Sequence, residues 1–363
     1  MKRSIFAAIV LTAAFSQWPA DARATSTTRY AERSDQVVDA AALNQLDLQN
    51  ARGLIQVRPS TDGKLHVTAV KLCRFQGHRD AERYARETVV EARAEQGRWV
   101  MRVKYPKRIE AKINFWDLFS EHGRNGLSFP MVEVQLLIQA PARMAASLET
   151  VSGDVDIQGI TGALRLRTVS GDLTVRDAGG WLDAATVSGD LDLMRVNRTV
   201  ARTTSGDISA HDTGALSVTT TSGSIEVVAP RDSVQLNSTS GDIEVAGPVR
   251  YISAGTSSGD VSVRQASGLV RLSSMSGDVQ VGLVAPLRLC NLSSTSGDLG
   301  VTFGPGIDAG LDLRTLSGTM DCTLPVRTTR QERTHLSAIL GKGGAAVALQ
   351  TVSGDINLTS GGN

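Results

Sequence analysis

Carboxylates and hydroxyls that recur at a fixed spacing are the residues of this sequence with the clearest chemical potential. The tripeptide Ser-Gly-Asp begins at Ser152, Ser170, Ser188, Ser205, Ser240, Ser258, Ser276, Ser296 and Ser353, with variants at Ser222 and Ser317. A column of carboxylates repeated in this way is a candidate for Ca²⁺ held by oxygen ligands. However, Ser224 and Thr319 replace the aspartate in the two variants, and the Gly-Gly-x-Gly-x-Asp repeat of calcium-binding β-rolls is absent. We therefore expect no metal and no cofactor.

Motifs that would carry catalysis are weak. The segment from Gly255 to Gly259 matches the Gly-x-Ser-x-Gly nucleophile elbow, but it lies in register with the repeat, which explains it without chemistry. The segment Gly341-Lys-Gly-Gly-Ala-Ala346 resembles a dinucleotide-binding loop, yet no βαβ pattern surrounds it, and it fits a coil interrupted by an excursion better. The five histidines are far apart in the sequence. We therefore expect no catalytic residues and no enzyme.

The spacing of the repeat predicts a solenoid. Steps between successive motif serines are 18, 18, 17, 17, 18, 18, 18, 20, 21 and 36 residues, and a constant period of this length is typical of stacked coils. Apolar residues stand one and three places after each aspartate, as in Leu173/Val175 and Leu191/Leu193, and a polar residue separates them. This alternation predicts a short strand with one buried face. A second strand precedes each motif, so we expect an all-β, single-stranded, right-handed parallel β-helix of about 18-residue coils.

The Ser-Gly-Asp tripeptides are expected to form the corners between these strands. Glycine permits the positive φ of a tight bend, and aspartate accepts backbone N–H groups in an Asx-type turn. A hydroxyl residue stands two places before every motif serine, so hydroxyl ladders along the stack are also expected. The residues to which we assign this structural turn role are Gly153, Asp154, Gly171, Asp172, Gly189, Asp190, Gly206, Asp207, Gly241, Asp242, Gly259, Asp260, Gly277, Asp278, Gly297, Asp298, Gly354 and Asp355.

The chain divides into three parts on these patterns: 1–24, 25–146 and 147–363. The first part is read as a signal peptide, because a basic start at Lys2 and Arg3 precedes an apolar run and Ala22-Arg-Ala24 supplies a cleavage pattern. The apolar run is too short to span a bilayer, and no later apolar segment is long enough for a transmembrane anchor. We therefore expect an exported protein, periplasmic or extracellular.

Residues 25–146 are expected to form a β-rich cap region with one short helix. Strands are predicted over 43–49, 54–57, 65–72, 89–94, 99–105 and 132–139, with Asn50-Ala-Arg-Gly53 as a turn and Asp80 as the helix cap. The intervening loop over 106–130 contains Phe115, Trp116, Phe119 and Phe129. These aromatics are the candidate partner surface, and the alternative is that they cover the open end of the solenoid.

Charge and cysteine content exclude some classes of protein. The net charge of the 363 residues is +1, so no bulk attraction to nucleic acid is expected. From Ser147 onward, 16 basic residues stand against 22 acidic ones, which makes the repeats mildly acidic. The three cysteines lie at different places in the repeat, so we favour buried free thiols over a Cys290–Cys322 disulfide.

The repeated phrase Thr150-Val-Ser-Gly-Asp-Val155 resembles the DUF4097 family of adhesin-like β-strand-repeat proteins. The lead-in Gln139-Ala-Pro-Ala142 and the late segment Gly341-Lys-Gly-Gly344 are also similar to that family, and the likeness covers about residues 43–358. The resemblance implies a β-solenoid at the bacterial envelope and supplies no catalytic residues. The loop over 115–130 is longer than the family usually has, so no role is transferred to it.

Three classes of function follow from these observations. The first is a non-catalytic envelope protein, an adhesin-like or scaffold β-solenoid that binds an unknown protein or envelope polymer. The second is a self-assembling or regulatory module in envelope-stress signalling, which would associate through the edges of the solenoid. The third is a carbohydrate-active β-helix enzyme, which requires two carboxylates about 5–9.5 Å apart in a groove beside a basic side chain.

Overall fold

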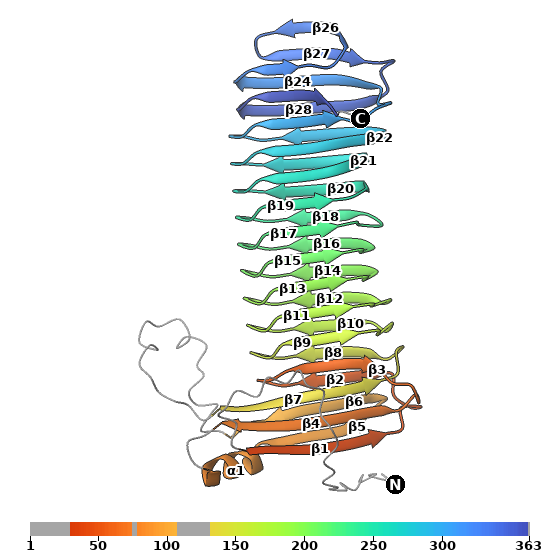
Figure 1. The fold of residues 1–363 in the computed structure, drawn as a ribbon, viewed down its shortest axis with the longest axis vertical. Helices are drawn as coiled ribbons and strands as arrows, with labels where there is room; N and C mark the ends of the chain where they lie inside the picture. Colours follow the sequence, from red (N-terminus) through yellow and green to blue (C-terminus); the bar gives the residue numbers. More distant parts are fainter. Residues whose placement is uncertain (1–29, 75–77, 107–130, 362–363) are drawn as a thin grey trace. The chain divides into compact units, whose positions relative to one another are not determined.

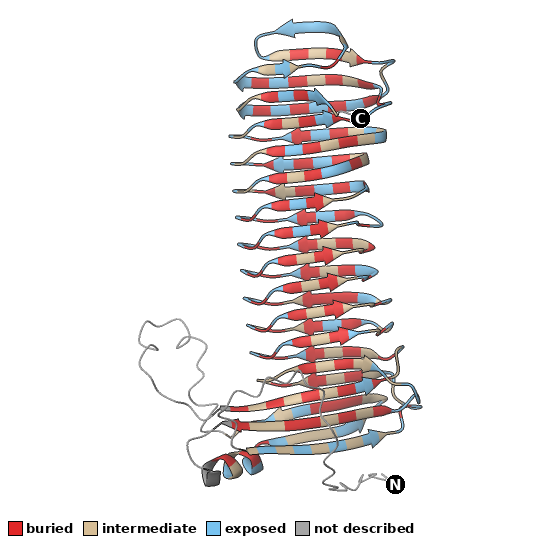
Figure 2. Cartoon of the chain, viewed as in Figure 1, coloured by how far each residue is buried: buried red, intermediate tan, exposed pale blue. Residues whose placement is uncertain are grey.

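The computed structural model describes residues 30–74, 78–106 and 131–361, and the chain divides between Gly162 and Ala163 into two compact units. Within the described residues there are twenty-nine strands and one helix, so the predicted all-β class is confirmed. Both units are built from short strands whose side chains alternate between buried and exposed (Figure 2). No helix among these residues is long and apolar enough to cross a membrane.

Unit 1 contains the helix and the first nine strands (Figure 1). Their bounds are β1 Tyr30–Val38, β2 Gln45–Gln49, β3 Ile55–Pro59, β4 Leu65–Arg74, α1 His78–Glu87, β5 Val89–Glu95, β6 Arg98–Lys104, β7 Met131–Ala140, β8 Ala145–Glu149 and β9 Val155–Gln158. The helix begins two residues before Asp80, so the prediction that Asp80 caps it is wrong. Ala81 and Ala85 are fully buried on one helix face, as their spacing predicts.

Three coils of unit 1 stack in an order that differs from their order in the sequence. Strand β2 lies between β6 and β8 and is parallel to both, with Leu46 paired with Trp99 on one side and Ala146 on the other. Strand β3 lies in the same way between β7 and β9. Beyond these coils the pairing becomes antiparallel: β4 pairs with β7, β1 with β4, and β5 with β6. The first coil in the sequence is therefore the middle coil of the stack.

The segment Asn50-Ala-Arg-Gly53 is the corner of this middle coil. Gly53 and Gly153 lie at equivalent corners, because a Cβ on Gly153 would lie 2.2 Å from the carbonyl oxygen of Gly53. Asn50 takes the place of the motif threonine, and its side-chain amide donates to the carbonyl of Val134 at 2.8 Å. The hydroxyl of Tyr105 lies 2.8 Å from Asn50 Oδ1. The sequence prediction of a simple turn missed a divergent repeat, because asparagine and tyrosine here replace the usual hydroxyl ladder.

Unit 2 is a parallel β-helix with two sheets along the stack (Figure 1). Most coils contribute one short strand to each sheet, whereas the strands over 261–274 and 279–293 each run through both. Its first strands in chain order are β10 Leu164–Arg167, β11 Leu173–Arg176, β12 Trp181–Ala185, β13 Leu191–Met194, β14 Arg198–Arg202, β15 Ile208–His211, β16 Ala215–Thr219, β17 Ile225–Val228, β18 Val234–Asn237, β19 Ile243–Ala246 and β20 Val249–Thr256. The remainder are β21 Val261–Ser274, β22 Val279–Ser293, β23 Leu299–Phe303, β24 Ala309–Ser317, β25 Met320–Cys322, β26 Val326–Glu332, β27 His335–Leu340, β28 Ala345–Ser353 and β29 Ile356–Ser360.

The core of unit 2 is a set of continuous apolar columns. Leu173 pairs with Leu191, and Leu191 with Ile208, so that each inward side chain packs on its counterpart in the next coil. These residues are at most 1% exposed. Burial of one such side chain stabilises the fold by about 1.5–3 kcal/mol, and repetition over many coils multiplies this contribution. The solenoid prediction is confirmed by this register.

The C-terminal coil is out of sequence order in the stack (Figure 1). Strand β28 lies between β22 and β24 and is parallel to both, and β29 lies between β23 and β25. The hairpin of β26 and β27 then continues the sheet beyond β24 in antiparallel fashion. The expectation that every repeat stacks on the preceding one is therefore wrong for the last repeat. The 36-residue step contains this hairpin, and the chain returns from it into the gap between two earlier coils.

Candidate ligand-binding surfaces

The corner glycines are required by the close approach of neighbouring coils. A Cβ on Gly206 would lie 1.9 Å from the carbonyl oxygen of Gly189, and a Cβ on Gly223 would lie 1.9 Å from that of Gly206. No glycine of a Ser-Gly-Asp motif in the described residues has φ in the left-handed region, so the expectation of a positive φ is wrong. The bend is instead stabilised by the motif threonine, since Thr186 Oγ1 accepts the N–H of Gly189 at 3.0 Å.

The corner aspartates link successive coils. Asp172 Oδ1 accepts the backbone N–H of Asp190 at 2.9 Å, and Asp190 Oδ1 accepts that of Asp207 at 2.9 Å. Asp260 and Asp278 continue the same pattern farther along. The Asx-type turn predicted for these aspartates is thus replaced by a ladder between coils. Stacking brings the next backbone N–H within reach, and an ionised carboxylate is a strong acceptor for it.

The hydroxyl ladder expected at the position before the corner is also present. The hydroxyls of Thr256, Ser274 and Ser294 each donate to the carbonyl of the motif glycine in a neighbouring coil, at 3.2, 3.0 and 3.2 Å. A motif serine can make a similar contact between coils, as with Ser205, whose hydroxyl lies 3.3 Å from the carbonyl oxygen of Val187. The hydroxyls and carboxylates of the corners therefore hold the stack together.

A metal site at the corners finds no support in this geometry. Among the described residues, no group of three or more histidine, cysteine, aspartate or glutamate side chains is placed to hold a metal ion. The hollow beside Asp172, Asp190 and Asp207 is acidic, but an oxygen of each of these carboxylates is bound to a backbone N–H. Ser257, the centre of the elbow-like motif, lies at an ordinary corner, where its carbonyl accepts the N–H of Ser276 at 2.9 Å.

Asp312, His335 and Ser337 form a cluster that sequence spacing did not reveal. His335 Nε2 lies 2.6 Å from Asp312 Oδ1 and 3.1 Å from Ser337 Oγ. A catalytic triad requires the acid and the serine on different ring nitrogens, so that the imidazole accepts one proton while it donates the other. Here both partners contact the same nitrogen, and the antiparallel pairing of β24 with β27 explains why the residues meet. The arrangement is not that of a nucleophile and its base.

The aromatic residues predicted as a partner surface, Phe115, Trp116, Phe119 and Phe129, lie outside the described residues. The residues proposed as a signal peptide also lie outside them. Of the three aromatics in the repeats, Phe303 is buried, whereas Trp181 and Tyr251 are each 40% exposed. Exposed large aromatics on a regular polar sheet are candidates for ligand contact.

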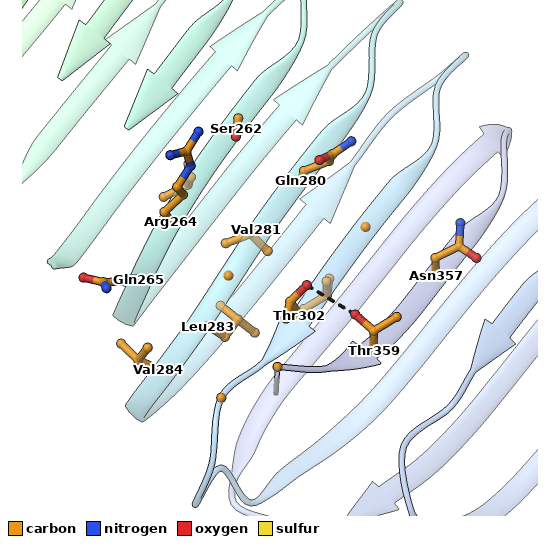
Figure 3. Close-up of a pocket in the computed structure, with 16 residues that line it drawn as sticks. Ser262, Arg264, Gln265, Gln280, Val281, Leu283, Val284, Thr302, Asn357 and Thr359 are labelled. Atoms are coloured by element: carbon orange, nitrogen blue, oxygen red, sulfur yellow. Dashed lines mark hydrogen bonds between the residues drawn. The ribbon is translucent and has the colours of Figure 1, made fainter. Parts of the chain in front are cut away.

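A hollow of about 530 Å³ lies on the outer face of β21, β22, β23 and β29 (Figure 3). It forms where glycines, Gly282 and Gly300, occupy outward positions, so that no side chain covers the strands at these two points. Gln280 and Asn357 lie at its rim, and Thr302 and Thr359 are joined by a hydrogen bond of 3.2 Å. No carboxylate lines this hollow, so it lacks the acid pair of a glycoside hydrolase.

A second hollow, of about 500 Å³, lies on the other sheet of unit 2, over β12, β14, β16, β18, β20 and β21. We call it the aromatic groove, and it contains Trp181, Arg198, Val200, Ser217, Tyr251 and Arg271 among its lining residues. No carboxylate lines it either. Sequence reasoning identified both aromatics but did not bring them together, because a separation of 70 positions in the sequence conceals that the register aligns them along one sheet.

Comparison with known proteins identifies the repeats. The family model described as Toastrack DUF4097 matches residues 182–253 and 232–359. A search of curated proteins gave no match.

Solved structures show similarity at low sequence identity. A "putative cell adhesion protein" from Clostridium sporogenes is 9% identical with a TM-score of 0.21, and the match covers 92% of this chain and 100% of that one. A "putative adhesin" from Bacteroides fragilis is 10% identical with a TM-score of 0.27, covering 90% and 97%. A "putative lipid binding protein" from Parabacteroides distasonis is 13% identical with a TM-score of 0.34, covering 90% and 96%.

Proposed function

We propose that this chain, which belongs to the DUF4097 family over residues 182–359, is a non-catalytic, adhesin-like envelope protein that binds a protein or polymer partner. The observation that carries the proposal is the regular, outward-facing surface of unit 2, where the hollows of about 530 and 500 Å³ are lined by no carboxylate. Such surfaces provide repeated contact groups and lack an acid–base pair. The names of the three similar structures agree with binding, but their TM-scores are too low to transfer a ligand.

Export is part of the same proposal. A basic start, an apolar run and the Ala22-Arg-Ala24 pattern support cleavage of a signal peptide and a location in the periplasm or outside the cell. Fractionation of cells followed by N-terminal sequencing of the product tests this directly. We expect a mature chain that begins near Thr25 in the exported fraction, and an uncleaved chain confined to the cytoplasm would contradict the proposal.

Self-association through the C-terminal sheet edges of unit 2 is less favoured. The terminal strand β26 is exposed along most of its length and carries Arg327, Arg330 and Glu332. Charged side chains on an edge strand oppose pairing with another chain. Strand β25, at the end of the other sheet, is only three residues long, which also offers little to a partner edge.

Pull-down of the full mature chain against isolated envelope material tests the binding function. We expect reproducible retention of one protein or one polymer on the immobilised chain, with no retention on the same chain unfolded before coupling. Mass measurement in solution is run alongside. A concentration-dependent oligomer that retains nothing would overturn the proposal in favour of self-assembly.

A further inference from the structure

We propose that the aromatic groove binds an extended anionic polysaccharide, an inference that rests on the proposed binding function and names its ligand. The groove lies on unit 2 alone and follows the stacking direction across β12, β14, β16, β18, β20 and β21. A ligand in such a groove meets one coil after another. The groove therefore presents its contact groups at the regular separation of the strands, and this suits a linear ligand with repeated units.

The two exposed aromatics lie in one column of the sheet. Trp181 pairs with Arg198, and Arg198 with Ala215, while the pairing of Val234 with Ile252 places Ser233 beside Tyr251. Trp181 and Tyr251 are thus four strands apart, roughly 19 Å at about 4.8 Å for each strand. Of the three residues between them, Arg198 is long and charged, whereas Ala215 and Ser233 are small. This arrangement provides an aromatic surface near each end of a shallow, open stretch.

Aromatic faces at this separation suit sugar rings. The C–H face of a pyranose is apolar and packs on an aromatic face, while its hydroxyls remain available for hydrogen bonds at the rim. Gln235 and Ser253 lie in the neighbouring outward column and present such polar groups. A bound chain that contacts both Trp181 and Tyr251 would pass beside them.

The groove also carries uncompensated positive charge. Arg198 and Arg271 are exposed, and among the described residues neither has a carboxylate partner. By contrast, Arg264 on the opposite sheet pairs with Glu244 at 2.8 Å. An arginine without an internal partner retains its full capacity to bind a carboxylate in a ligand, where two parallel hydrogen bonds are available.

Neighbouring coils reinforce this charge. Three arginines, Arg165, Arg167 and Arg202, surround the single carboxylate of Asp183 on the same sheet face. With Arg198 and Arg271, five arginines lie against one aspartate on this face of β10, β12, β14 and β21. The repeats as a whole are acidic, with 22 acidic against 16 basic residues from Ser147 onward. This face is therefore positively charged, although the repeats as a whole are acidic. A positive face favours a ligand with repeated negative charges.

Uronate polymers are the probes that fit this description. Binding of alginate oligosaccharides to the full mature chain is measured by calorimetry, with dextran as a neutral glycan and oligo-dT as an anionic chain of another class. We expect saturable binding of alginate that weakens as salt is raised, and little binding of dextran. Preference for dextran, or tighter binding of oligo-dT than of alginate, would overturn the proposal.

Variants on the groove locate the site. Trp181→Ala, Tyr251→Ala and the pair Arg198→Gln/Arg271→Gln should each weaken alginate binding by about tenfold or more. The matched controls are Arg264→Gln on the opposite sheet and Met275→Ala at an exposed corner, and both should bind as the parent does. Because all the groove residues changed are exposed, the unfolding midpoint should stay close to that of the parent. Equal binding by all variants would overturn the assignment.

The outcomes separate this inference from the proposed function. If the envelope pull-down retains a protein while alginate does not bind, the groove inference fails and the adhesin-like function stands. If neither envelope material nor alginate is retained, both fail.

Discussion

Asp298 Oδ1 accepts a hydrogen bond from the backbone N–H of Asp355 at 2.7 Å, although 57 residues separate them in the sequence. Asp355 Oδ1 in turn accepts the N–H of Thr319, at 2.7 Å. The ladder of corner side chains therefore runs from the motif at Ser296 to the last motif of the sequence, at Ser353. From there it continues to the motif at Ser317, which comes earlier in the chain. Hydroxyl bonds from Thr351 to the Gly297 carbonyl and from Thr315 to the Gly354 carbonyl follow the same order.

Removal of residues 342–363 should unfold the end of unit 2. The deletion takes away β28 and β29, whose Val347, Leu349, Ile356 and Leu358 are buried, and each contributes about 1.5–3 kcal/mol. Strand β24 would lose its only parallel partner among the described strands. Hydrogen exchange should show loss of protection over 309–340, while β13 to β19 stay protected.

Deletion of 362–363 alone is the control, and it should leave exchange unchanged. Retained protection over 309–340 in the longer deletion would show that β24 can stack directly on β22, and the inserted coil would then not be essential.

Gly206→Ala should destabilise unit 2. The new Cβ would lie 1.9 Å from the carbonyl oxygen of Gly189, and a backbone atom within a stack cannot move aside as a flexible side chain can. Overpacking of this kind costs about 1–3 kcal/mol. The matched control is Gly310→Ala, where the nearest atom lies 4.0 Å from the Cβ position. Urea midpoints of the two variants measure the difference, and equal midpoints would contradict the close-approach explanation.

The repeats could be predicted from sequence because their determinants are local. The alternation in Leu173-Thr-Val175 fixes which side chains point inward, and the constant period then places Leu173 on Leu191. The reason for the corner glycine could not be obtained in this way. It depends on the distance from Gly206 to a carbonyl in another coil, and a local turn rule does not contain that distance.

The order of the coils was also beyond the sequence pattern. The phrase at Thr351 is as regular as the earlier ones, so nothing in it distinguishes a terminal coil from an inserted one. The aromatic groove was missed for a related reason. Trp181 and Tyr251 are aligned only through the register of four successive strand pairings, and in the sequence each is one outward-facing residue among many.

Acid should weaken the link between Asp355 and Thr319. The N–H of Thr319 donates to the Asp355 carboxylate and lowers its pKa below the usual value. A lowered pKa in the folded state gives stability that is present above the unfolded pKa and is lost as pH falls through the folded value. Asp355→Asn removes the titration but keeps an oxygen acceptor. The melting temperature of the parent should exceed that of the variant near pH 6, and the two should converge near pH 2.

Asp321→Asn in the neighbouring coil is the matched control, because the Asp321 side chain is exposed and makes no hydrogen bond or ion pair among the described residues. Its melting temperature should follow that of the parent at every pH. A constant difference between Asp355→Asn and the parent across the range would show that the carboxylate contributes no pH-dependent stability.

The three thiols should differ sharply in reactivity. All three are free in the structure, as predicted, with Cys73 and Cys290 buried and Cys322 partly exposed. Burial raises the pKa of Cys290 to about 12 and that of Cys73 to about 11, so neither supplies thiolate near neutral pH. A thiol reagent at pH 8 should therefore label one cysteine quickly and the other two only after unfolding. In Cys322→Ser the fast reaction should disappear, and a fast reaction that persists would mean that one of the buried coils opens in the native state.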